Sequence, residues 1–262
     1  MAKYTRGTVK DFPGFDARSD AEVLRKAMKG LGTDEDPILK ILTGRSNAQR
    51  QEIAVQFKTL FGRDLIDDLK SELTGKLETL MVSLMRPERI YDAHALKHAI
   101  KGAGTDEQVL TEILASRTPA EIRNIKQVYQ EEYEADLEDH ITSDTSGYYQ
   151  RMLVVLLQAN RDPDGQIKEI FDKYMTISGF QIEETIDRET SGPLEKLLLA
   201  IVKCVRSVPA YFAECLFYAM KGAGTDDETL IRIMVSRSEK DLLDIRQAFR
   251  RDFAKSLHHV IQ

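Results

Sequence analysis

Apolar residues recur along this chain at the spacing of one face of an α-helix. Steps of three and one are clearest in two segments: Leu77, Leu80, Met81, Leu84 and Met85, and then Leu194, Leu197, Leu198, Ile201 and Val202. Positions spaced in this way lie on one side of a helix. No segment alternates apolar and polar residues convincingly, as a half-buried strand would. The pattern therefore predicts an all-α fold.

One short segment of the sequence occurs three times. Residues 29–35, Lys-Gly-Leu-Gly-Thr-Asp-Glu, recur as 101–107 at an offset of 72 residues, and a close copy occupies 221–227. The register of the first two copies holds beyond the segment, since Leu24 aligns with Leu96. Self-similarity at a fixed period is typical of helical-repeat proteins.

Helix starts within these repeated units are marked by capping boxes, in which a Ser or Thr and a Glu or Gln three residues later bond the first backbone N–H groups. Four pairs fit: Ser46 with Gln49, Thr105 with Gln108, Thr118 with Glu121, and Thr225 with Glu228. The caps and the apolar stripes together predict about five helices per unit.

The period breaks after the second copy of the glycine segment. From Gly104 to Gly224 is 120 residues, which is neither 72 nor 144. We therefore expect part of a unit to be absent between them. The predicted organisation is an N-terminal tail, two whole units, the C-terminal half of a third and the N-terminal half of a fourth: residues 1–15, 16–87, 88–160, 161–206 and 207–262.

Each glycine segment is expected to form a loop between two helices. Glycine permits positive φ, so the loop carbonyls can turn outward. Forty residues after the second loop glycine, the first two units carry an acidic residue in another interhelical turn, Glu72 and Asp144. If the two turns meet, five oxygens converge in the first unit: the carbonyls of Met28, Gly30 and Gly32 and both carboxylate oxygens of Glu72.

This donor set favours calcium. Calcium takes about 6–8 oxygen ligands and accepts backbone carbonyls, whereas magnesium demands a tighter octahedron and zinc prefers nitrogen or sulfur. About two coordination positions would remain for water or a lipid phosphoryl oxygen. The alternative is that the glycines only end one helix and that Glu72 and Asp144 only cap the next.

The formal net charge of −6 limits the partners of this chain. A nucleic-acid-binding protein would show a basic domain or stripe, so nucleic acid is excluded as the expected partner. An acidic protein also needs a bridging cation or a local basic patch to bind an acidic bilayer. A calcium ion at the glycine loops would supply that bridge.

These motifs make the chain resemble the annexin family over essentially its whole length: the Lys-Gly-x-Gly-Thr-Asp loop, the acidic residue 40 positions later, and Arg45, Arg117 and Arg237. The resemblance implies a curved disc of annexin-type repeats, incomplete here in its C-terminal half. It also implies calcium-dependent binding to phosphatidylserine-containing membranes, assembly into trimers or two-dimensional lattices there, and anticoagulant and phospholipase-inhibiting effects.

The resemblance assigns calcium ligands by position. The first site is Met28, Gly30, Gly32 and Glu72, and the second is Ile100, Gly102, Gly104 and Asp144. Thr33 and Glu35 resemble a weaker neighbouring site. The fourth unit has Met220, Gly222 and Gly224 without a carboxylate of its own, and the third unit keeps only Glu189. We hypothesise that Glu189 completes the site at Gly222.

Other signals are weaker. Asp92, Glu112 and Arg117 match positions that line a hydrated channel in annexins, and an interrepeat salt-bridge network is the alternative. His94 and His98 lie one helical turn apart without a third ligand, and we expect a packed or surface pair.

No nucleophile, base and orienting group can be assembled from the sequence, so an enzyme is not expected. A helical-repeat scaffold for a protein partner is the rival function. Residues 1–18 do not resemble a secretory signal, and no apolar run approaches the roughly 20 residues of a membrane span. We therefore expect a cytoplasmic protein that is peripheral at membranes when calcium is present, with release to the cell exterior left open.

Overall fold

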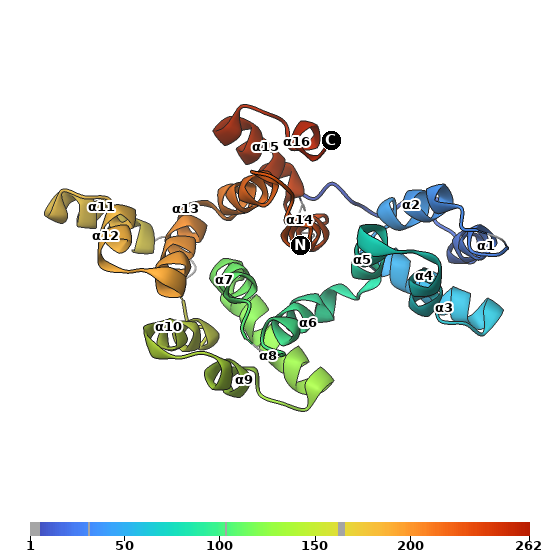
Figure 1. Cartoon of the computed structure of the whole chain (residues 1–262), viewed down its shortest axis with the longest axis horizontal. Helices are drawn as coiled ribbons and strands as arrows, with labels where there is room; N and C mark the ends of the chain where they lie inside the picture. Colours follow the sequence, from blue (N-terminus) through green and yellow to red (C-terminus); the bar gives the residue numbers. More distant parts are fainter. Residues whose placement is uncertain (1–5, 31, 103, 162–165) are drawn as a thin grey trace. The chain divides into compact units, whose positions relative to one another are not determined.

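The computed structural model describes residues 6–30, 32–102, 104–161 and 166–262, and within these ranges it contains helices and no strand (Figure 1). The all-α prediction is therefore confirmed. The chain divides into two compact units, which we describe separately. Unit 1 combines residues 1–88 with 212–262, and unit 2 is residues 89–211.

Unit 1 holds the first five helices and the last three, together with the end of α13. The first five are α1 (Ala17–Ala27), α2 (Glu35–Thr43), α3 (Asn47–Phe61), α4 (Leu65–Glu72) and α5 (Gly75–Met85). The last three are α14 (Asp227–Arg237), α15 (Leu242–Phe253) and α16 (Leu257–Ile261).

Unit 2 holds the helices in between. They are α6 (Glu88–Ala99), α7 (Glu107–Ser116), α8 (Pro119–Tyr133), α9 (Leu137–Asp144), α10 (Gly147–Leu157), α11 (Gln166–Ser178) and α12 (Ile182–Glu189). Helix α13 (Gly192–Met220) crosses the boundary between the units and is bent, since Ser207 has the non-helical angles φ −167° and ψ 108°.

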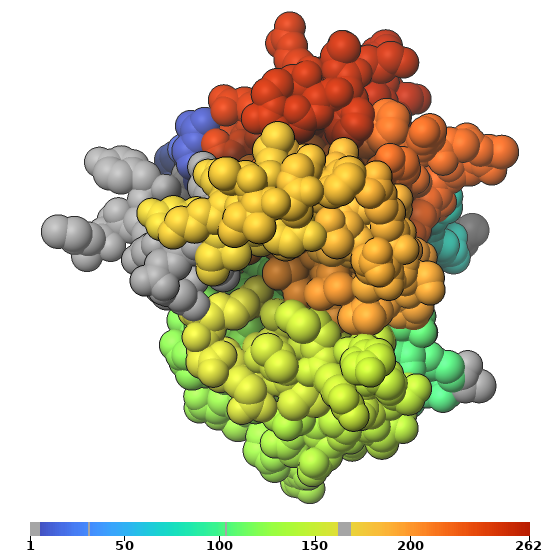
Figure 2. Space-filling model, turned by 90° about the vertical axis from the view of Figure 1, so that its left-hand side faces the viewer, coloured from blue at the N-terminus to red at the C-terminus, as the bar shows by residue number. Residues whose placement is uncertain are grey.

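Helices α11 and α12 of unit 2 are yellow to light orange in Figure 2, and α11 exposes a position that is buried in the second repeat. Ile125 on α8 is 3% exposed, whereas Ile170, at the matching position on α11, is 55% exposed. Helix α8 follows two helices, α6 and α7, but α11 follows α10 of the preceding repeat and packs against α12. The matching isoleucine therefore lacks the cover that burial requires.

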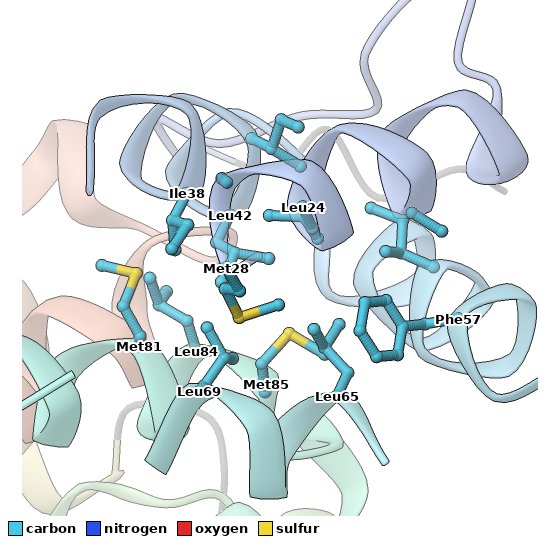
Figure 3. Close-up of a cluster of buried hydrophobic side chains, with 14 of the residues drawn as sticks. Leu24, Met28, Ile38, Leu42, Phe57, Leu65, Leu69, Met81, Leu84 and Met85 are labelled. Carbon is cyan, nitrogen blue, oxygen red and sulfur yellow. The ribbon is translucent and has the colours of Figure 1, made fainter. Parts of the chain in front are cut away.

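In unit 1 the side chains of α1 to α5 converge on one core (Figure 3). Helix α1 packs chiefly on α3, and Leu24 and Phe57 are both fully buried there. Leu69 of α4 and Met81 of α5 close the other side. The apolar stripe read from residues 77–85 is thus the face of α5 that joins this core.

The N-terminal segment ties the last helices of unit 1 to the first. The N–H groups of Thr8 and Val9 donate to the carbonyl of Ser238, at 2.7 and 3.1 Å. Further along, the side chain of Gln49 on α3 bonds both the N–H and the carbonyl of Phe12, at 2.9 and 3.2 Å. The backbone of this segment therefore connects the end of α14, through the Ser238 carbonyl, to α3, through the Gln49 side chain.

Two of the four predicted capping boxes are confirmed and two are wrong. Ser46 with Gln49 and Thr118 with Glu121 form the reciprocal bonds. In the other two cases the N-cap is the next residue, since Asp106 accepts from the N–H of Val109 and Asp226 from that of Thr229. Threonine and aspartate are both good caps. The hydroxyl of Thr105 bonds the second acidic turn instead, which leaves the cap to the aspartate.

Buried arginines pair with carboxylates. Arg117 donates to Asp92 through Nε at 2.7 Å and Nη2 at 2.9 Å. Burial acts to lower the pKa of Arg117, but the attraction of Asp92 outweighs it, and the pKa is raised. This pair links α6 to the end of α7 inside one repeat, and the interrepeat network and the channel lining stay predictions. In unit 1 the matching Arg45 binds Asp20 in the same way.

The fourth repeat departs from this pairing. The position that matches Asp20 is Phe212, and Arg237 instead bonds Asp241 at 2.7 and 2.6 Å. Its guanidinium also lies 4.8 Å from the centre of the Phe212 ring. Arg237 thus pairs with a carboxylate four residues later in the chain instead of one on the preceding helix. The Phe212 ring adds a cation–π contact.

Candidate calcium site

The first glycine loop leaves α1 through two residues of positive φ. These are Gly30 at 127° and Gly32 at 90°, values that L side chains rarely adopt. The N–H of Asp34 donates to the carbonyl of Ala27 at 2.9 Å and closes the loop. Among the described residues, no backbone hydrogen bond occupies the carbonyls of Met28, Gly30 or Gly32. Residue 31 lies outside the described residues.

The loop is joined directly to the acidic turn 39 residues away. The hydroxyl of Thr33 donates to Glu72 Oε2 at 2.6 Å, and its oxygen lies 3.5 Å from the backbone carbonyl oxygen of Glu72. Glu72 is the last residue of α4, and its side chain is exposed. The structure therefore brings the two turns together, as the constant spacing between them predicts.

The second repeat reproduces this arrangement. Gly102 and Gly104 have φ of 122° and 117°, and Thr105 donates to the backbone carbonyl of Asp144 at 3.0 Å. Asp144 ends α9, as Glu72 ends α4. Ile100 is the residue that follows α6, and its N–H still bonds Leu96. Residue 103 lies outside the described residues.

The third loop has the same backbone but different surroundings. Gly222 and Gly224 have φ of 124° and 138°, and the N–H of Asp226 donates to the carbonyl of Ala219 at 2.7 Å. Beside this loop, Lys76 at the start of α5 forms an ion pair with Asp227 at the start of α14. The pair borders a cavity of about 580 Å³ between the two helix starts.

The remaining candidate ligands are placed as follows. Glu35 is the exposed first residue of α2, and Met220 is the last residue of α13. Glu189 ends α12 in unit 2, whereas the loop at Gly222 belongs to unit 1. The hypothesis that these two complete one site stays a prediction.

The residues of the first two loops suit a hard cation such as calcium. Each loop offers backbone carbonyls and one nearby carboxylate, all of them oxygen donors of the kind that calcium accepts. No group of three His, Cys, Asp or Glu side chains is close enough to hold a metal among the described residues. Any ion at these loops would therefore depend mainly on backbone carbonyls.

The sequence reading missed the role of two threonines. We assigned Thr33 to a neighbouring site and Thr105 to a helix cap, but both hydroxyls fasten a glycine loop to its acidic turn. The signal was present, because a threonine follows the second glycine in all three loops, the third being Thr225. The role of this threonine depends on which group its hydroxyl contacts, and only the packing of the helices decides that.

Comparisons with known proteins identify the family of this chain. The family model described as Annexin matches residues 19–84, 91–156, 161–201 and 211–262. The chain belongs to the annexin family. Annexin A5 of Gallus gallus is 70% identical over 301 aligned positions, which cover 100% of this chain and 94% of the relative.

Solved structures of annexins share the fold. The structure of chicken annexin V superposes with a TM-score of 0.95 at 70% identity and covers 99% of this chain and 95% of its own. The calcium-bound structure of annexin (Sm)1 has a TM-score of 0.82 at 32% identity and covers 99% of this chain and 89% of its own. The predicted annexin-repeat fold is confirmed, whereas coverage of 94% of the relative gives no support to the predicted loss of repeat parts.

Membership of this family carries the function with it. Annexins bind acidic phospholipids in a calcium-dependent way, with anticoagulant effects, and calcium is the cofactor. Within the part of the chain that the structure describes, no helix has both the length and the apolar character needed to cross a membrane.

Proposed function

We propose that this annexin binds phosphatidylserine-containing membranes through calcium ions held at its first two glycine loops. The observation that carries the proposal is the hydrogen bond of 2.6 Å between Thr33 and Glu72. It joins a carbonyl-bearing loop to a carboxylate that is 39 residues away in the sequence. Without that junction, the loop would be only a helix end.

The first ion would be held by the carbonyls of Met28, Gly30 and Gly32 and by the carboxylate of Glu72. The second would be held by the carbonyls of Ile100, Gly102 and Gly104 and by Asp144. Calcium takes about 6–8 oxygens, so each shell has room for a lipid phosphoryl oxygen. The bound ion supplies positive charge where a chain of net charge −6 meets an anionic surface.

The weaker candidates belong to the same proposal. Thr33 and Glu35 would serve a neighbouring site of lower affinity. Met220, Gly222 and Gly224 would bind well only if Glu189 supplies the missing carboxylate. Replacing Glu189 with Gln should then reduce the number of bound calcium ions by one, and an unchanged number would contradict that pairing.

We also propose that the third repeat lacks its first two helices. The alignment with chicken annexin A5 runs over 301 positions, although this chain has 262 residues, which leaves 39 positions unmatched. The 55% exposure of Ile170 is what the loss of a covering helix pair would produce. Assembly into trimers or lattices on the membrane, a non-enzymatic role and a peripheral cytoplasmic location complete the proposal.

Sedimentation with phosphatidylserine vesicles tests the function. The chain should pellet with calcium and stay in solution with a chelator. Glu72→Gln and Asp144→Asn should each raise the calcium concentration needed for pelleting, and the double variant should raise it most. Glu52→Gln, which alters an exposed residue of α3, is the matched control. Pelleting that ignores calcium, or none at all, would favour the rival scaffold function instead.

A further inference from the structure

The last turns of α6 carry a pair of histidines whose ring nitrogens nearly touch. His94 and His98 are separated by one helical turn, and their Nε2 atoms lie 3.1 Å apart. The ring centres are 4.3 Å apart, so the two nitrogens are closer to each other than the rings are. The Nε2 atoms therefore lie on the facing sides of the two rings, close enough for one to donate a hydrogen bond to the other.

This separation fits two ligands of one transition-metal ion. Nitrogens that each lie about 2.0–2.1 Å from a metal, at an angle of about 90–109°, are about 2.9–3.3 Å apart. We propose that His94 and His98 form a two-histidine site for a late first-row divalent ion, such as Ni²⁺, Cu²⁺ or Zn²⁺. Imidazole nitrogen suits these ions, whereas calcium prefers oxygen.

The pair is specific to the second repeat. The matching positions in the first repeat are Glu22 and Lys26, both exposed on α1. Among the other histidines, His140 lies 2.7 Å from the hydroxyl of Tyr129. His258 and His259 are adjacent in the sequence, and neighbours at that spacing point to different sides of a helix. The chain therefore offers one such site.

The histidine site offers nitrogen ligands and the calcium loops offer oxygen ligands, although α6 leads into one of these loops. The carbonyl of His98 accepts from Lys101 at 3.3 Å, and that of Ala99 accepts from Asp106 at 2.8 Å. An ion on the two rings would hold the last turns of α6 without using any loop oxygen. The variant with Glu72→Gln and Asp144→Asn should therefore still bind it, which separates this proposal from the calcium function.

Calorimetric titration of the untagged chain with Ni²⁺ tests the proposal. We expect one ion per chain, and a loss of affinity of at least about tenfold for His94→Ala and for His98→Ala, because each removes one arm of the chelate. The double variant His258→Ala with His259→Ala also removes two histidines and is the matched control, with unchanged binding. Normal thermal unfolding of each variant shows that the fold is intact.

A second experiment adds a metal site to α1 and leaves α6 unchanged. The double variant Glu22→His with Lys26→His should bind two Ni²⁺ ions per chain instead of one, since these exposed positions repeat the spacing of the natural pair. Cu²⁺ bound to the natural chain should show coupling to two nitrogens in electron paramagnetic resonance. Wild-type affinity in both single alanine variants would overturn the proposal, as would loss of binding in the control.

Discussion

Among the described residues, four helices are followed at once by a residue in the left-handed conformation, and two of these residues are not glycine. The residue after α3, α8, α11 and α15 has φ of 64° at Gly62, 51° at Glu134, 75° at Gly179 and 58° at Ala254. The four occupy the same position of the repeat. A residue with a Cβ pays about 1–2 kcal/mol for this conformation. Glycine avoids that cost but loses about 0.4–1 kcal/mol more chain entropy on folding.

The difference predicts that Ala254→Gly stabilises unit 1 by about 0.5–1 kcal/mol. Glu134 carries a second cost, because its exposed carboxylate lies at the C-terminal end of α8, where the helix dipole disfavours negative charge by about 0.3–1 kcal/mol. Glu134→Gly should therefore gain about 1–2 kcal/mol. Glu134→Gln should gain only the electrostatic part.

Thermal unfolding in the absence of calcium measures these effects. A change of 1 kcal/mol shifts the midpoint by about 2–4 °C in a domain of 150–250 residues. Gly62→Ala is the reverse control and should lower the midpoint. The reasoning fails if Ala254→Gly leaves the midpoint unchanged or lowers it while Gly62→Ala is tolerated, because the conformation would then carry no cost for a side chain.

Three further changes test other parts of the structure. Asp92→Asn should cost about 3–5 kcal/mol in urea unfolding, because it leaves the charge of Arg117 buried without its carboxylate. Burial raises the pKa of Tyr129 to about 12 from 10.0. The neutral phenol thus stabilises the fold below pH 10, and this contribution disappears between about pH 10 and 12. Tyr129→Phe should therefore lose less stability over that range than the wild type. Gly7→Ala places a methyl group against the backbone of Glu239 and should speed amide exchange of the N-terminal segment and lower the thermal midpoint.

The sequence anticipated the features that depend on spacing. The 72-residue offset and the constant distance to Glu72 and Asp144 were sufficient to predict helices, loops and the meeting of two turns. Spacing alone did not reveal that threonine hydroxyls fasten the turns. It also placed two helix starts one residue early, because Thr105 and Asp106 are both competent caps and only the packed structure decides between them.

The sequence pattern also could not predict which side chains contact each other, because such contacts depend on packing. His94 and His98 were expected to be a packed or surface pair, yet the separation of their nitrogens depends on rotamers. The partner of Arg237 was equally hidden, since Phe212 stands where other repeats have aspartate and the arginine turns to Asp241. Such outcomes follow from competition between nearby partners rather than from periodicity.

The division of the chain gives its synthesis a particular order. Unit 1 is assembled from residues 1–88 and 212–262, whereas unit 2 is one continuous stretch. A ribosome that adds about 5–20 residues per second needs roughly 6–25 s to pass from residue 88 to 212. During that interval the Ser238 carbonyl that receives Thr8 does not yet exist. The N-terminal segment must therefore wait for its late partner, and a chaperone could bind this segment during that interval.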